Sequence, residues 1–254
     1  MKRKKILLCI LLTAALLVGC NARSVTPLAV GVPTEINGKE FTITTEQAYP
    51  DDDEILAVNA IYGDQTLKLD ESLEVKGVYE VVQKDGTYML TETGTFNDWR
   101  VVYLLRADAK EITETDVIDG SLGDMPKNPE DGFSITSKID VLGSYGGTRT
   151  YTIENGCFVT DSTLYEFRGT PDGYRPVLTV TGEISCRIEG GSTELKPGDV
   201  ITPTAYSEDG VFYFEREDGT PGSFQVDLDE EGNYAYTIGG VDENKLFESL
   251  PYAG

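Results

Sequence analysis

Histidine is absent from the 254-residue chain. Its absence excludes Ser-His-Asp and Cys-His nucleophile systems and every metal site that needs an imidazole ligand. Hydrolysis by a pair of carboxylates stays open as an alternative, since the chain holds 44 Asp and Glu residues. Because the sequence distinguishes no pair among so many acids, we assign no catalytic residue and expect the protein not to be an enzyme.

Basic residues are scarce, with 21 Lys and Arg and a formal net charge of −23. We do not expect so acidic a chain to bind nucleic acid, whose phosphates require a basic face, or to dock electrostatically on anionic lipid. We favour the interpretation that the acidic surface keeps an extracellular protein soluble. A calcium ion or a basic partner is the alternative.

The chain also lacks an apolar run of the about 20 residues that cross a membrane as a helix. Its longest such segment, residues 6–19, has 14 residues and follows the basic residues 2–5, as in a signal peptide. The motif Leu17-Val18-Gly19-Cys20 at its end resembles the lipobox of bacterial lipoproteins. The resemblance implies cleavage after Gly19 and attachment of diacylglycerol to Cys20, whose two lipid chains give a stable anchor.

Cleavage would leave 17 basic residues against 44 acidic ones, a formal charge of −27. We therefore expect an acidic protein at the extracytoplasmic face of the cell membrane, held there through the lipid on Cys20. Two further cysteines, Cys157 and Cys186, remain in the expected mature chain. They could form a disulfide in an exported protein or stay as small buried hydrophobic residues. We favour the second, because each lies in an apolar, strand-like run.

Short runs rich in Val, Ile, Thr, Tyr and Phe dominate the chain from about residue 34. Residues 101–105 are apolar on both faces and predict a buried central strand, whereas Phe212 and Phe214 alternate with polar neighbours and predict a half-buried strand. One short helix is expected at residues 242–250, capped by Asp242 and ended by Pro251. Acid-Gly and Asn-Gly steps between the runs predict hairpin turns at residues 84–86, 154–156, 208–210, 217–219 and 231–233. The sequence therefore predicts an all-β fold.

Two segments, residues 85–103 and 131–151, repeat at an offset of 46 to 49 residues. This period suits a propeller blade; two ordinary β-meanders are the alternative. Residues 131–151 resemble propeller-type (VCBS/FG-GAP-like) repeats, which occur in surface lipoproteins of Gram-positive bacteria, although the acidic D-x-D-x-D-G loop of that family is absent. After a signal peptide (residues 1–19) and a Pro-interrupted tether (residues 20–33), we expect residues 34–176 to form a β repeat region, either a partial propeller or sandwich-like.

The C-terminal part contains LKPGD at residues 195–199, VFYFE at 211–215 and EDGTPGSF at 217–224. These motifs resemble the bacterial SH3-like fold, with Ser-Phe where the family has Trp-Ile. The resemblance implies a small SH3-like barrel over residues 177–254. Such domains often bind peptidoglycan or peptides, but this analogy of fold does not establish a site.

Three successive acids, Asp51, Asp52 and Asp53, could gather a calcium ion, because hard cations prefer several carboxylate oxygens. A solvated loop is the alternative that we favour. Residues 227–233 open like a calcium loop, but the twelfth position holds Ile238 where an EF-hand has its bidentate Glu, so we interpret them as a hairpin turn.

The only tryptophan, Trp99, could offer a stacking face to a sugar ring or a peptide together with Tyr145, Tyr206 and Tyr213. Ordinary core or turn packing is the alternative for all four. We expect a non-catalytic binding or scaffolding protein of the cell envelope, with a wall polymer or another envelope protein as partner. The alternatives are a carboxylate-dependent hydrolase, which predicts two acids facing each other in a deep cleft, and a calcium-stabilised structural module.

Overall fold

The computed structural model describes residues 23–47, 55–69, 72–95, 99–169, 175–228 and 235–253. All strand pairs given for these residues are antiparallel, and the only helices are two short 3-10 helices, η2 (Pro129–Asp131) and η3 (Glu243–Lys245). The all-β class is therefore confirmed. Within these ranges, no helix has the length and hydrophobicity needed to span a bilayer.

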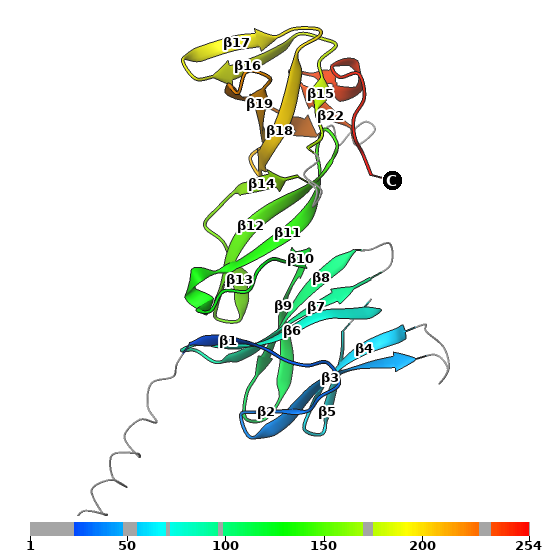
Figure 1. Cartoon of the computed structure of the whole chain (residues 1–254), viewed down its shortest axis with the longest axis vertical. Helices are drawn as coiled ribbons and strands as arrows, with labels where there is room; N and C mark the ends of the chain where they lie inside the picture. The colour runs from blue at the N-terminus through cyan, green and yellow to red at the C-terminus, as the bar shows by residue number, and fades with distance from the viewer. Residues whose placement is uncertain are drawn as a thin grey trace, which may run out of the picture.

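Two sheets pack face to face in the N-terminal part of the molecule (Figure 1). Their shared core includes Phe41, Ile43 and Tyr62 from one sheet and Met89 and Leu105 from the other. This packing corresponds to the sandwich-like alternative. The four-stranded sheet has the order β2 (Thr34–Ile36), β3 (Lys39–Gln47), β4 (Ile55–Tyr62), β5 (Gln65–Leu69), and the five-stranded sheet has the order β1 (Ser24–Pro27), β6 (Glu74–Val82), β7 (Thr87–Gly94), β8 (Arg100–Ala107), β9 (Ile112–Asp119).

Strand β1 lies inside the segment that was expected to be a tether. It pairs with β6 at the edge of the five-stranded sheet, with Val25 opposite Val81. A local pattern cannot reveal this pairing, because the partner lies more than 50 residues along the chain. The tether expected over residues 20–33 therefore contributes a strand to the sandwich.

Strand β8 confirms the prediction for residues 101–105. It lies between β7 and β9, and its side chains alternate between two cores. Tyr103 and Leu105 face the four-stranded sheet, whereas Val102 and Leu104 face a second core that includes Phe133. Because both faces of β8 are buried, neither face carries polar side chains, which explains the continuous apolar run of residues 101–105.

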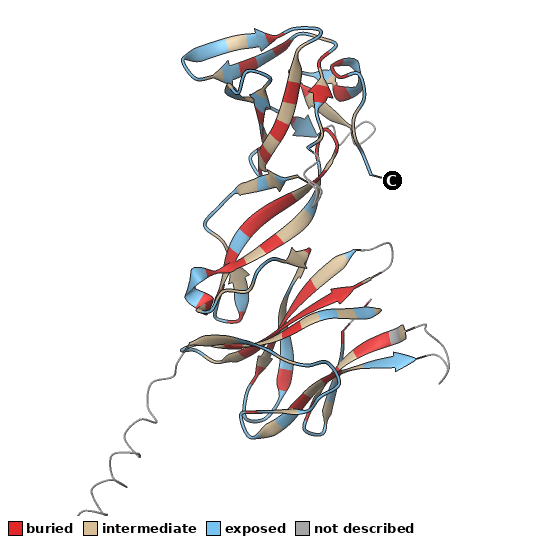
Figure 2. Ribbon diagram, in the orientation of Figure 1, coloured by how far each residue is buried: buried red, intermediate tan, exposed pale blue. Residues whose placement is uncertain are grey.

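The long hairpin of β11 (Phe133–Asp140) and β12 (Ser144–Glu154) joins the two halves of the molecule (Figure 2). Phe133 and Ile153 at one end pack on the five-stranded sheet, and Leu142 and Tyr145 at the other end belong to the C-terminal core. The hairpin continues into an open sheet with β10 (Ser121–Leu122), β13 (Cys157–Val159), β14 (Leu164–Arg168), β15 (Leu178–Thr179), β16 (Ile184–Ile188), β17 (Gly191–Leu195), β18 (Val200–Ser207), β19 (Val211–Arg216) and β20 (Pro221–Gln225). A small sheet of β21 (Asp227–Leu228), β22 (Tyr236–Ile238) and β23 (Val241–Asp242) follows.

This topology changes two expectations about organisation. The repeat segments form the hairpins β7–β8 and β11–β12, which belong to two different sheets. Strand β14 pairs with β18, so one sheet crosses the expected boundary between residues 176 and 177. The described strands of the C-terminal part do not close into the expected barrel.

The C-terminal helix expected at residues 242–250 is wrong, apart from its first turn. Asp242 does cap that turn by accepting from Asn244 N, but the helix ends at Lys245. Beyond it, Leu246 O accepts from Thr181 N and Glu248 N donates to Thr179 O, so the backbone is committed to strand-like bonds. These long-range bonds outcompete the helix that the local sequence favours.

Hairpin turns occur at four of the five predicted positions; the fifth, residues 231–233, lies outside the described residues. At the β12–β13 turn, Asn155 and Gly156 both take positive φ, as the Asn-Gly step predicts. Cys157 and Cys186 are both free thiols. Cys186 is buried as expected, whereas Cys157 is exposed beside the turn, so the expectation of burial is wrong for it.

Candidate functional site

A groove of about 420 Å³ lies where the five-stranded sheet meets the β11–β12 hairpin. Its lining comes from five separate parts of the chain, two of which are the two strands of the β11–β12 hairpin. We call it the Trp99 groove, and its lining residues are Trp99, Arg100, Asp119, Gly120, Ser121, Thr136, Ser137, Lys138, Ser144, Tyr145, Gly146 and Ala253.

Trp99 is the most exposed aromatic side chain among the described residues, with 47% of its surface accessible. It directly precedes β8, and its carbonyl accepts from Thr95 N at 2.8 Å, which fixes the backbone that carries the ring. The Lys138 Nζ atom lies 5.3 Å from the centroid of the indole ring. A large apolar ring is therefore presented to solvent beside an ammonium group.

Two serine hydroxyl groups of the groove are held in fixed orientations. Ser137 Oγ donates to Asp119 O at 2.6 Å. Ser144 Oγ donates to Asp140 Oδ1 at 2.5 Å and accepts from Ala253 N at 2.9 Å. Because their bonds set these rotamers, the groove is organised before any ligand enters.

Gly120 allows the chain to pass from β9 into β10 at the floor of the groove. Its φ of +151° lies in a region that L side chains rarely adopt, and a Cβ atom there would come within 2.7 Å of Thr136 O. Gly120 N donates to Arg100 O at 2.8 Å. This close approach requires glycine and brings the end of β9 against β11.

The C-terminal segment reaches the groove at Ala253. Pro251 O accepts from Ser144 N at 3.1 Å, and Ala253 O lies 3.5 Å from Lys138 Nζ. Sequence analysis missed Lys138, Ser144 and Ala253 as site residues. No local pattern marks them, because they lie near Trp99 only through the fold.

Two of the four aromatic candidates, Trp99 and Tyr145, line the same groove. Tyr145 is 6% exposed, donates its hydroxyl proton to Leu142 O at 2.8 Å, and stacks on Phe167 with ring centroids 4.5 Å apart. Its ring is therefore part of the C-terminal core. The alternative of ordinary packing applies to Tyr145.

The other two candidates lie elsewhere. Tyr206 on β18 packs against the C-terminal core, and burial raises its pKa. Tyr213 on β19 is 36% exposed and lines a separate hollow with Leu164 and Arg175. The structure therefore does not bring the four aromatic residues together.

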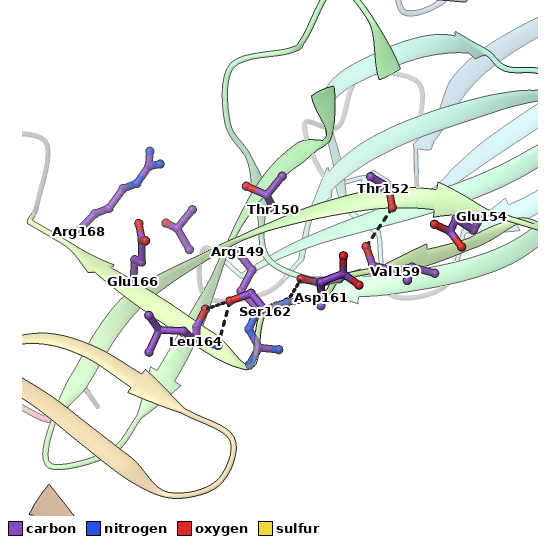
Figure 3. A pocket seen from close by; sticks show the side chains of 12 residues that line it. Arg149, Thr150, Thr152, Glu154, Val159, Asp161, Ser162, Leu164, Glu166 and Arg168 are labelled. Carbon is purple, nitrogen blue, oxygen red and sulfur yellow. Dashed lines mark hydrogen bonds between the residues drawn. The ribbon is translucent and has the colours of Figure 1, made fainter. Parts of the chain in front are cut away.

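A second hollow, of about 390 Å³, runs along β12 and β14 (Figure 3). Arg149 is its most distinctive member, but the side chain is almost fully buried. Its guanidinium donates to Glu208 Oε1 at 2.5 Å and to Thr163 O at 2.6 Å, and lies 3.4 Å from the centroid of the Tyr165 ring. These contacts give Arg149 a structural role, and Arg168 is the exposed cation of this hollow.

Burial raises the carboxyl pKa of Glu92 and of Glu243. Glu92 Oε1 lies 3.3 Å from Arg100 Nη1. Glu243 accepts from Tyr252 Oη at 2.8 Å and from Tyr236 N at 3.3 Å. Glu92 thus pairs with a cation and Glu243 with hydroxyl and amide groups, while the neighbouring Asp242 carboxylate also raises the pKa of Glu243.

No group of three or more acidic or cysteine side chains with the spacing of a metal site occurs within the described ranges. Asp51, Asp52 and Asp53 lie outside them, so the calcium expectation at these residues stays a prediction.

No family model, no curated protein and no solved structure matches this chain. The lipoprotein, propeller-type and SH3-like resemblances of the sequence therefore stay predictions. The candidate site is defined by the geometry of the Trp99 groove alone.

Proposed function

We propose that this protein is a lipid-anchored, non-catalytic binding protein of the cell envelope. Its ligand, a wall polymer or another envelope protein, is held in the Trp99 groove. The observation that carries the proposal is the exposure of the chain's only tryptophan in a groove whose hydroxyl groups are already oriented. Large exposed aromatic rings are typical of binding sites, because their apolar body gains contact area at a small entropy cost.

The anchor is supported by the basic residues, the 14-residue apolar segment and the motif that ends in Cys20. Residues 1–22 lie outside the described residues. The strongly acidic composition is compatible with an envelope location, because it keeps the folded part soluble without drawing it onto anionic lipid.

Membrane fractionation of the Cys20→Ser chain tests the anchor. The native protein should sediment with membranes, and the variant should move to the soluble or released fraction, because the thiol that carries the lipid is gone. A Cys157→Ser chain is the matched control and should fractionate like the native protein. Equal membrane retention of the Cys20→Ser chain would overturn the anchor.

Retention on purified cell wall tests the binding role. Deletion of residues 177–254 is a poor test, because it would expose Leu142 and Tyr145 of the shared core. Trp99→Ala is sharper, since the ring is exposed and its loss leaves the core intact. We expect the native chain to be retained, the variant to be lost, and Tyr213→Ala to behave like the native chain.

A further inference from the structure

We infer that the Trp99 groove takes an uncharged saccharide chain rather than an extended peptide, an inference that rests on the proposed binding function. The groove joins an exposed indole ring, fixed hydroxyl groups and paired charges in one place. The ring and the hydroxyl groups favour a sugar, and the paired charges favour an uncharged one.

Backbone pairing argues against a peptide. A bound extended peptide draws affinity from a free sheet edge with unpaired N–H and C=O groups. Of the strands that line the groove, β8 lies between β7 and β9. Strand β10 covers β11 only at Ile135 and Thr136, so residues 137–140 of β11 pair on one side only, with β12. The edge strand β10 has only two residues.

At the junction of β9 and β10, further backbone groups are already hydrogen-bonded. Asp119 O accepts from Ser137 Oγ at 2.6 Å, and Gly120 N donates to Arg100 O at 2.8 Å. A peptide laid along this groove would therefore find only the short edge at residues 137–140 of β11 to extend.

The exposed ring argues for a sugar. A pyranose has an apolar C–H face with partial positive charge and a rim of hydroxyl groups, and the face of an indole ring is electron-rich. Lys138 Nζ lies 5.3 Å from the ring centroid, within the range of a cation–π contact, so this ring already attracts positive charge. The side chains of Ser137, Ser144 and Asp119 line the same groove. Because both serine hydroxyl protons are already donated, these side chains offer acceptors to the hydroxyl groups of a sugar.

Charge balance argues for an uncharged chain. Both cations of the groove are paired: Lys138 Nζ lies 3.2 Å from Asp140 Oδ2, and Arg100 Nη1 lies 3.3 Å from Glu92 Oε1. The groove therefore offers no excess positive charge to an anionic polymer, and the expected mature chain, at −27, repels one.

Calorimetric titration of the full lipidated chain tests the inference. The protein is kept in a detergent without a sugar headgroup, so that the detergent does not compete. The probes are a β-1,4-linked tetramer of N-acetylglucosamine and, separately, an uncharged, acetylated and amidated tetrapeptide. We expect saturable binding of the tetramer only, and a loss of about tenfold or more in affinity for Trp99→Ala.

Tyr213→Ala is the matched control, since Tyr213 is also an exposed aromatic residue but lies outside the groove. It should bind the tetramer like the native chain. Both variants should have the same melting temperature as the native chain, which shows that each is folded.

Three results would overturn the inference: binding of the peptide but not the tetramer, tetramer binding that Trp99→Ala leaves unchanged, or no binding of the tetramer. If the native chain is still retained on purified wall in that last case, the proposed function stands and only the ligand class is wrong. Loss of wall retention as well would remove the proposed function itself.

Discussion

The two large sheets differ in how many of their faces are buried. The five-stranded sheet is covered on both faces, so Tyr103 and Leu105 of β8 enter one core and Val102 and Leu104 enter another. In the C-terminal sheet, β19 buries Phe212 and Phe214 but exposes Tyr213 between them. A sheet buried on both faces has little surface left for recognition, so the Trp99 ring projects from the chain just before β8, outside the strand itself.

The largest effects are expected on stability, from alanine substitutions that test this comparison. In β8, Leu104→Ala and Leu105→Ala should each lower the free energy of unfolding by about 3 kcal/mol, because both faces are core. In β19, Phe212→Ala should cost about 4 kcal/mol and Tyr213→Ala less than about 1 kcal/mol. Urea unfolding measures all four. A cost for Leu105→Ala as small as that of Tyr213→Ala would contradict the two-faced burial of β8.

The next largest effect is expected in the reaction rates of the two free thiols. Cys157 is exposed, whereas burial raises the pKa of the Cys186 thiol. Because the thiolate is the nucleophile, Cys157 should react with a disulfide reagent about tenfold faster or more at neutral pH.

Mass mapping of the labelled native chain, with a urea-unfolded sample as reference, identifies the reactive thiol. Equal rates in the native chain would show that Cys186 is accessible and that the C-terminal core is looser than described.

A smaller effect is expected at the buried acid of the C-terminal part. Burial raises the pKa of Glu243. A carboxyl with a raised pKa in the folded state favours folding below the ordinary carboxyl pKa, and that contribution is lost as pH rises through the raised value.

Glu243→Gln should therefore flatten the fall in stability across the mildly acidic range, by on the order of 1 kcal/mol. Thermal unfolding between pH 4 and pH 7 measures it, with Glu248→Gln, at an exposed position, as the control. A slope that stays unchanged in Glu243→Gln would show that burial of this carboxyl does not govern the pH dependence.

The smallest effect is expected from removal of calcium. No metal-binding group occurs among the acids in the described ranges, and Asp51, Asp52 and Asp53 lie outside them. Addition of a chelator should shift the melting temperature by less than about 2 °C. A larger fall, restored by excess calcium, would favour the calcium-stabilised alternative.

Much of the local structure could be predicted from the sequence. Four Asp-Gly or Asn-Gly turns, the two-faced strand at residues 101–105 and the alternating strand at Phe212 follow from short-range preferences. Most of the failures are long-range. The expected tether contains a strand, because Val25 pairs with Val81. The expected helix ends early, because residues 246–248 form backbone hydrogen bonds with residues 179–181.

The candidate site was only partly predictable for the same reason. The rarity of tryptophan pointed to Trp99, but Tyr145 looked equally suitable until its ring was found stacked on Phe167. Lys138 and Ala253 reach the groove through pairings and tail contacts that no local pattern encodes.

The most direct test of the account follows from the fact that Trp99 is the only tryptophan in the chain. Its fluorescence therefore reports on the groove alone. On addition of purified cell wall, we expect the emission maximum to move to shorter wavelength and quenching by acrylamide to fall, because the ligand covers the ring. An unchanged emission from protein that sediments with the wall would contradict the account.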